Sequence, residues 1–124
     1  MIKSNDMTIE GLMTICKRLK GVTTDIKWED HLCFNVGEKI FLISSPDIVP
    51  HTASFKVSED DFEALIERNG INQARYFAKR QWVSVDDIAL LSEKEWTHYL
   101  SESHRLVASK LTRKKRVVLG IEKH

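Results

Sequence analysis

Apolar residues recur every three or four positions in three stretches of the chain, which is the spacing of one helix face. The first stretch covers residues 9–20, with Thr8 as its N-cap and Gly21 just after its end. The second covers Glu59–Asn69, which follows the capping residue Ser58. Its inward-facing residues should be Phe62, Leu65 and Ile66.

The third stretch opens with a complete capping box, Ser92-Glu93-Lys94-Glu95. An apolar stripe then runs from Trp96 to Leu111, and Lys110 falls within it. A lysine in such a position usually packs its aliphatic stem and extends its ammonium group to water. A functional lysine that reaches across the edge of the sheet would occupy the same position, so both interpretations stay open.

A period of two, typical of strands with one buried face, replaces the helical spacing elsewhere. Gly37-Glu38 should form a two-residue hairpin loop, and Ile71–Lys79 should be irregular or form a short helical turn. The expected strands are Thr24–Trp28, His31–Val36, Lys39–Ser44, His51–Val57 and a fifth near Gln81–Val85. These elements predict an α+β fold, with a mostly antiparallel sheet of about five strands and helices packed on one face.

Helices on one side of the sheet would leave its other face open to water or to a ligand. An indole beside cations on that face suits stacking on a base while the cations contact phosphates. Trp82 could equally lie buried beneath Arg75–Lys79, and the sequence leaves both positions of the indole open. The alternation of inward and outward side chains predicts which residues face the open side. They are His31, Cys33 and Asn35 of the second expected strand, Thr52, Ser54 and Lys56 of the fourth, and Arg80, Trp82 and Ser84 at the fifth.

The composition fits one soluble domain that spans residues 1–124. Of these residues 42% are hydrophobic and 30% charged, and no apolar run approaches the length of a membrane helix. Met1–Glu10 lacks the pattern of a signal peptide, and two cysteines cannot form a disulfide framework. We therefore expect a cytoplasmic protein with no membrane partner and with a monomer as its default state.

The basic residues are concentrated at the C-terminal end. Residues 105–124 contain seven lysines and arginines and one glutamate, a net charge of +6, so residues 1–104 carry −5 of the overall +1. Residues 112–124 are predicted to form a basic tail that can fray. Such a tail either presents cations to phosphates or simply keeps the protein in solution.

Motifs for catalysis or cofactor binding do not stand out. The glycines are scattered rather than grouped in a phosphate-binding loop, and Cys16 and Cys33 are too far apart for a CxxC pair. His31 and Cys33 could form a dyad on one strand face, but no third group orients them, so an inert thiol is expected. The protein is therefore expected not to be an enzyme and to hold neither a cofactor nor a metal ion.

Five blocks of sequence resemble the MmcQ/YjbR family of small bacterial proteins, in the family's order and over roughly residues 7–116. The blocks are Thr23–Trp28, Leu32–Gly37 with Lys39–Phe41, Ala53–Val57, Lys79–Val83 and Leu106–Leu111. The resemblance implies a CyaY-like fold, similar to that of bacterial frataxin, and DNA binding through a double-wing arrangement.

On this resemblance, two blocks carry the residues of interest. Lys79, Arg80 and Trp82 fall on the family's Lys-Arg-x-Trp block, and Lys110, Lys114 and Lys115 fall on its C-terminal lysine block. The chain departs from the family pattern at Gln81, where His is common, and at Thr112, where Pro is common.

The leading hypothesis is a non-enzymatic domain that binds nucleic acid, DNA in particular, weakly through the open sheet face and the basic C-terminal helix. One alternative is a protein- or small-ligand-binding module on the same sheet face. A more remote alternative, by analogy with frataxin, is metal handling by Asp60, Asp61 and Glu63. The candidate nucleic-acid-binding residues are Lys56, Lys79, Arg80, Trp82, Lys110, Arg113, Lys114, Lys115 and Arg116.

Overall fold

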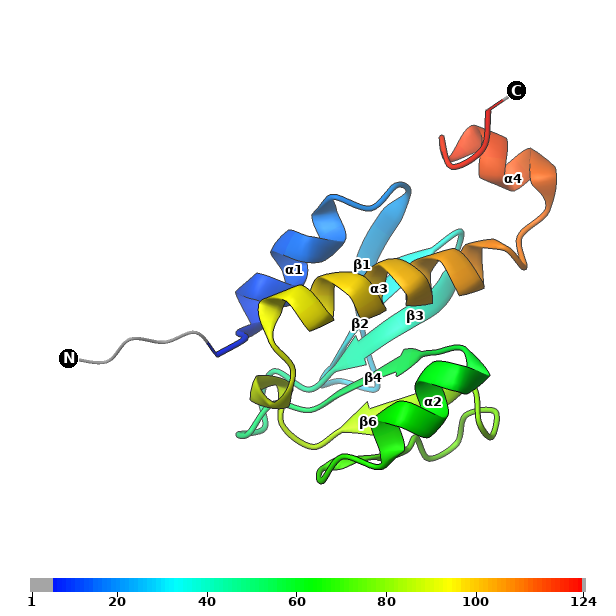
Figure 1. The fold of residues 1–124 in the computed structure, drawn as a ribbon. Coiled ribbons are helices and arrows are strands. Elements are labelled where there is room, and N and C mark those ends of the chain that lie inside the picture. Colours follow the sequence, from blue (N-terminus) through cyan, green and yellow to red (C-terminus); the bar gives the residue numbers. More distant parts are fainter. Residues whose placement is uncertain (1–5, 124) are drawn as a thin grey trace.

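An antiparallel β-sheet forms one layer of the molecule, and helices α1, α2 and α3 cover one of its faces (Figure 1). The structure is a computed structural model that describes residues 6–123. Within that range the sheet has six strands in the order β1-β2-β3-β4-β6-β5. The predicted α+β class is therefore confirmed. The signal-peptide prediction for Met1–Glu10 rests partly on residues 1–5, which lie outside the described residues.

The elements have the following bounds. The helices are α1 (Ile9–Lys17), α2 (Glu59–Ile66), α3 (Glu93–Ala108) and α4 (Arg113–Val118), and a 3-10 turn covers Ile88–Leu90. The strands are β1 (Val22–Lys27), β2 (His31–Val36), β3 (Lys39–Ser44), β4 (Ala53–Lys56), β5 (Ile71–Gln73) and β6 (Trp82–Val85).

Several predicted elements need correction. Residues 71–79 were expected to be irregular or to form a short helical turn, but Ile71–Gln73 form strand β5. The sequence did not reveal this strand, because three residues are too few to show an alternating pattern. Ile66 was expected to face inward, but it is 39% exposed at the last turn of α2. The apolar stripe that ends at Leu111 is not one helix: α3 stops at Ala108, and Lys110 lies exposed beyond it.

The basic C-terminal segment contains a short helix, since residues 113–118 form α4. Thr112 caps this helix, and its hydroxyl accepts a hydrogen bond from the Lys115 N–H at 3.2 Å. A Pro at this position, which the family commonly has, would lack the hydroxyl cap.

The hairpin between β2 and β3 turns at Gly37 and Glu38, as predicted. Both residues have positive φ, 56° and 71°, which a type I′ turn requires. Leu111, in the segment after α3, packs on this turn, and a Cβ on Gly37 would lie 2.6 Å from its Cδ1 atom. The turn therefore needs glycine for its backbone conformation and for the close approach of Leu111.

We expect Gly37→Ala to lower the free energy of unfolding by about 1–3 kcal/mol, because it adds both backbone strain and a steric clash. Gly120→Ala is the matched control: φ is 78° there too, but the added Cβ would meet Lys20 Cδ at an ordinary 3.8 Å. Urea denaturation followed by circular dichroism should show the larger loss for Gly37→Ala. Equal losses would mean that the contact with Leu111 contributes nothing.

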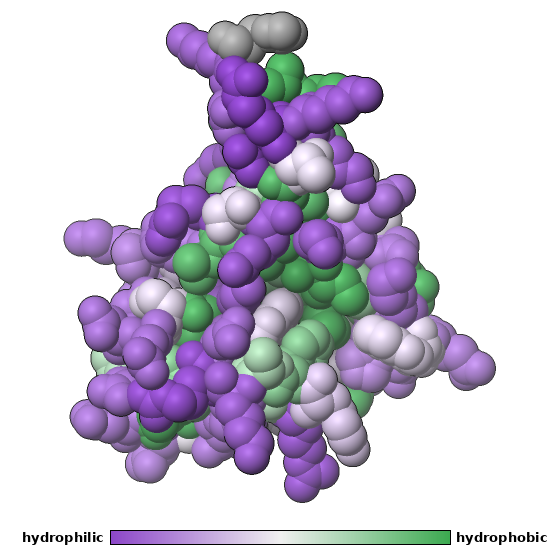
Figure 2. Space-filling model, turned by 90° about the vertical axis from the view of Figure 1, so that its right-hand side faces the viewer, coloured by the Kyte–Doolittle hydropathy of each residue, from purple (hydrophilic) through white to green (hydrophobic). Residues whose placement is uncertain are grey.

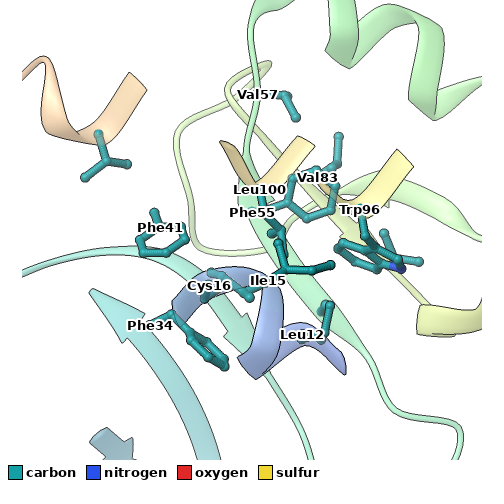
Figure 3. Packing of buried hydrophobic residues seen from close by; sticks show 14 of the residues in the cluster. Leu12, Ile15, Cys16, Phe34, Phe41, Phe55, Val57, Val83, Trp96 and Leu100 are labelled. Atoms are coloured by element: carbon teal, nitrogen blue, oxygen red, sulfur yellow. The ribbon is translucent and has the colours of Figure 1, made fainter. Parts of the chain in front are cut away.

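The hydrophobic core lies between the sheet and the helices, and Trp96 of α3 is fully buried in it (Figure 3). The Trp96 ring packs edge-on against Phe55 of β4, with ring centroids 5.3 Å apart. Its Nε1–H donates to the Ile88 carbonyl at 2.8 Å. The predicted capping box at Ser92 is confirmed. Cys16 of α1 faces the same core, and burial raises the pKa of its thiol to about 12.

A buried serine of α3 connects the helix to β3 and β4. Ser103 Oγ donates to the Phe41 carbonyl at 2.6 Å and accepts from the Lys56 N–H at 3.0 Å. The pairing of β3 with β4 ends at Leu42 and Phe55, so Phe41 and Lys56 do not pair with each other. The Ser103 hydroxyl bonds to the backbone groups of both residues instead. This bridge fixes the backbone of Lys56, a candidate site residue.

Candidate functional site

The sheet face away from the helices carries a row of mostly small and polar side chains. A cavity of about 900 Å³ lies over this face, and we call it the sheet-face groove. His31, Thr52, Ser54 and Ser84, all predicted to face this side, line it. Strand pairing places one residue from each of the six strands in a single row across the sheet: Asp25, Cys33, Ile43, Ser54, Ser84 and Asn72.

Trp82, the predicted stacking surface, is buried. Its indole is 7% exposed and stacks on Phe77, with ring centroids 4.3 Å apart and an interplanar angle of 22°. Phe77 belongs to the segment Arg75–Lys79, so the structure has the buried position of the indole rather than the exposed one. Trp82 therefore cannot stack on a nucleic-acid base in this conformation.

Arg80, another candidate contact, is already engaged by acidic side chains of α2. Its Nε donates to Glu59 at 3.0 Å, and a second guanidinium nitrogen donates to Glu63. The guanidinium also lies 5.4 Å from the centroid of the Phe62 ring. These pairs cancel most of the positive field that Arg80 would offer to a phosphate.

The cations of α4 are also largely paired. Arg113 and Arg116 donate to the two carboxylate oxygens of Glu122 at 2.8 and 2.6 Å, and they hold the pKa of Glu122 below its usual value. Lys115 lies 3.5 Å from Glu38 of the β2–β3 turn. Lys114 is exposed and, among the described residues, has no ion pair within 4 Å.

Lys56, Lys39 and Lys110 form a cationic cluster, which we call the lysine cluster. The pKa of Lys56 lies below its usual value because the amine is partly buried and because Lys110 and Lys39 repel its charged form. Over residues 6–123, none of these lysines has a carboxylate within ion-pair distance. The cluster is therefore a concentration of positive charge that the fold itself does not neutralise.

The lysine cluster lies at the end of the molecule where α3 stops and α4 begins. Lys110 follows α3, Lys56 ends β4 and Lys39 opens β3. The segment that joins α3 and α4 is on the right of Figure 1. Figure 2 views the molecule from that side, and hydrophilic side chains cover most of the visible surface, including the region of α4 at the top.

Cys33 and Asn35, predicted to face outward, are buried on the open side of the sheet. Burial and the nearby carboxylate of Asp25 raise the pKa of the Cys33 thiol. Asn35 Nδ2 donates to Asp25 Oδ1 at 2.9 Å. The expected inert state of Cys33 agrees with its complete burial, since a thiolate is the reactive form.

The acidic residues at the start of α2 have structural partners. Glu59 and Glu63 bind Arg80, and the Asp61 N–H donates to the capping hydroxyl of Ser58 at 3.2 Å. Over residues 6–123, no group of three His, Cys, Asp or Glu side chains is arranged to hold a metal ion. The same stretch contains no helix with the length and apolar character needed to cross a bilayer.

Sequence reasoning missed three residues of these surfaces. Trp28 was assigned to the end of a strand, but β1 ends at Lys27 and Trp28 lies in the turn. Tyr76 belongs to a segment without periodicity, so no pattern predicted where its ring would point. Lys39 was treated as the start of a strand, and the structure brings it near Lys56. All three positions depend on how distant segments pack.

A model of the YjbR family matches residues 17–106. A Deinococcus radiodurans protein with a DUF419 domain has a TM-score of 0.84 at 22% sequence identity, covering 98% of this chain and 94% of that one. A Pseudomonas syringae protein has a TM-score of 0.67 at 19% identity, covering 81% and 98%. At these identities the likeness concerns the fold. No curated protein matches the chain.

Proposed function

Because this chain belongs to the YjbR family, and the resemblance described above implies DNA binding, we propose that it is a non-enzymatic, cytoplasmic protein that binds nucleic acid weakly. The contact surface is the lysine cluster, extended by the exposed Lys114 at the start of α4. Trp82 is not part of it, because its indole is buried. Arg80, Arg113, Lys115 and Arg116 contribute little, since carboxylates already pair with them.

The observation that carries this proposal is that Lys56 lies near Lys110 and Lys39 and that, over residues 6–123, no carboxylate lies within ion-pair distance of any of the three. Like charges placed together destabilise the fold unless an anion compensates them. Glu59 and Glu63 pair instead with Arg80, and Glu122 pairs with Arg113 and Arg116. A phosphate backbone supplies the missing negative charge, and lysine ammonium groups bind phosphates as point charges.

Phosphate contacts of this kind give affinity without much choice of sequence. If about three phosphates are neutralised, log K should fall with log salt at a slope near −3. The affinity should then drop roughly 40-fold between 50 and 200 mM salt. Fluorescence anisotropy with a labelled 20-base-pair DNA measures this slope, and a slope near zero would reject the proposal.

Lys56→Met should weaken DNA binding and at the same time stabilise the protein. The pKa of Lys56 is lower in the folded than in the unfolded state, so its charged form costs the fold stability at all pH values below that pKa. The cost falls as the pH rises from that pKa toward the higher pKa of the unfolded chain, and it is gone above the latter. Removing the amine should raise the free energy of unfolding by about 0.5 kcal/mol and make the salt slope less steep by about 0.9.

Lys94→Met is the matched control, because Lys94 lies at the other end of α3 and its loss changes the net charge equally. We expect its DNA affinity and salt slope to stay close to those of the unaltered protein. If both variants weaken DNA binding equally, the affinity depends on the net charge of the protein and not on the lysine cluster. A loss of stability in Lys56→Met would contradict the repulsion argument.

A further inference from the structure

The rim of the sheet-face groove holds two aromatic residues that the fold leaves in solvent. Trp28 is 65% and Tyr76 98% exposed, and both have a left-handed backbone, with φ of 52° and 68°. Bulky residues seldom adopt this conformation, because it is sterically strained. The strain is not offset by burial of either ring: the Trp28 ring contacts His31 only edge-on, with centroids 5.9 Å apart.

Trp28 and Tyr76 approach the groove from opposite edges of the sheet. Trp28 lies in the turn between β1 and β2, and Tyr76 lies in the segment between β5 and β6. Strands β1 and β5 are the two edge strands, yet both aromatic residues line the same cavity of about 900 Å³. A ligand that carries flat rings can therefore stack at either side of the groove.

Between the two rings, the floor of the groove offers uncharged hydrogen-bonding groups. Hydroxyl and amide groups both donate and accept hydrogen bonds, so they can pair with a ligand edge that carries both donors and acceptors. The charged lining residues Arg75 and Asp86 have opposite signs, which favours a ligand part without net charge. The floor groups are Ser45, Thr52, Ser54, Ser84 and Asn72, around the apolar Ile43.

We infer that the sheet-face groove binds unpaired nucleobases. A nucleobase combines a flat apolar face, which stacks on Trp28 or Tyr76, with an edge of donors and acceptors, which bonds to the floor. In a duplex the neighbouring bases cover these faces, so the groove gives the protein a preference for single strands. The base site stands independently of the lysine cluster, whereas the preference for single-stranded nucleic acid rests on the function proposed above.

The base site is tested with nucleosides, which carry no phosphate. We expect deoxyadenosine and thymidine, titrated into the ¹⁵N-labelled protein, to shift the backbone amides of Ser54, Tyr76 and Ser84. The shifts should be equal at 50 and 200 mM salt, since no charge is neutralised. Glucose also packs on aromatic rings but is not flat. Absence of shifts with the nucleosides, or equal shifts with glucose, would overturn the inference.

Tyr76→Gly separates a binding role from a structural one, because glycine adopts the left-handed backbone without strain. We expect nucleoside binding to weaken at least about fivefold, with a melting temperature that is unchanged or higher. Val49→Ala is the control, since Val49 is exposed but does not line the groove. A lower melting temperature with unchanged nucleoside binding would assign Tyr76 a structural role and contradict the inference.

The two sites are distinguished with a 20-nucleotide single strand and a 20-base-pair duplex. Lys56→Met should weaken binding of the single strand and leave deoxyadenosine binding intact, whereas Tyr76→Gly should weaken both. Single-strand binding that Tyr76→Gly weakens and Lys56→Met leaves unchanged would support the groove and reject the lysine cluster as a phosphate site. Oligonucleotide binding without nucleoside binding, or equal affinity for both oligonucleotides, would reject the groove.

Discussion

Trp96→Ala should lower the free energy of unfolding by about 3–5 kcal/mol, the largest effect that we expect from one substitution. Trp96 is fully buried between α3 and the sheet and packs against Phe55. Its loss creates a cavity and leaves the Ile88 carbonyl without the indole N–H as its partner. Because domains of this size are stable by only about 5–15 kcal/mol, the variant should be close to unfolding at 37 °C.

Trp28→Ala is the matched control for this prediction, since it removes the same side chain from an exposed turn. We expect its free energy of unfolding to stay within about 0.5 kcal/mol of that of the unaltered protein. Urea denaturation followed by far-ultraviolet circular dichroism measures both variants. A loss below about 1 kcal/mol in Trp96→Ala would show that the packing around the indole is not what holds α3 on the sheet.

Ser103→Ala should cost about 2–4 kcal/mol, although it removes one oxygen atom. Ser103 Oγ satisfies the Phe41 carbonyl and the Lys56 N–H, both at a point where the β3–β4 ladder has ended. Each buried backbone group left without a partner costs about 1–3 kcal/mol. The bridge also sets the backbone of Lys56, so DNA affinity should fall together with stability.

Amide hydrogen exchange reports the loss of this bridge directly. In the unaltered protein the Lys56 amide should exchange slowly, and in Ser103→Ala it should exchange much faster than the amides of β2. Ser109→Ala serves as the comparison, because the Ser109 hydroxyl is exposed and donates within its own helix to the Leu106 carbonyl at 2.7 Å. If the Lys56 amide stays protected in Ser103→Ala, another group bonds it and the assigned role of Ser103 is wrong.

Much of the fold could be predicted from local patterns. The capping residues Thr8, Ser58 and Ser92 mark helix starts through hydrogen bonds that involve neighbouring residues alone. The two-residue turn at Gly37 likewise depends on local backbone conformation. Strand β5 could not be found this way, because its three residues are held by pairing with β6. The end of α3 at Ala108 is similarly hidden within an apolar stripe that continues to Leu111.

The candidate site could be predicted less well, since it depends on contacts between distant segments. Alternation correctly placed Ser54 and Ser84 on the open face. It could not show that Phe77 covers Trp82, because the path of the segment between β5 and β6 has no sequence period. Alternation also could not show that acidic residues of α2 pair with Arg80. Because of these pairs, the positive charge that stays without a carboxylate partner is at Lys56 and its neighbours Lys39 and Lys110.

The central claim is that the lysine cluster is the surface that binds nucleic acid. The most direct test is a titration of the ¹⁵N-labelled protein with a short DNA duplex at 50 and 200 mM salt, followed by nuclear magnetic resonance. We expect shifts concentrated at Lys39, Lys56 and Lys110 that shrink at the higher salt. Shifts concentrated instead at residues 79–82, or no shifts at the lower salt, would contradict it.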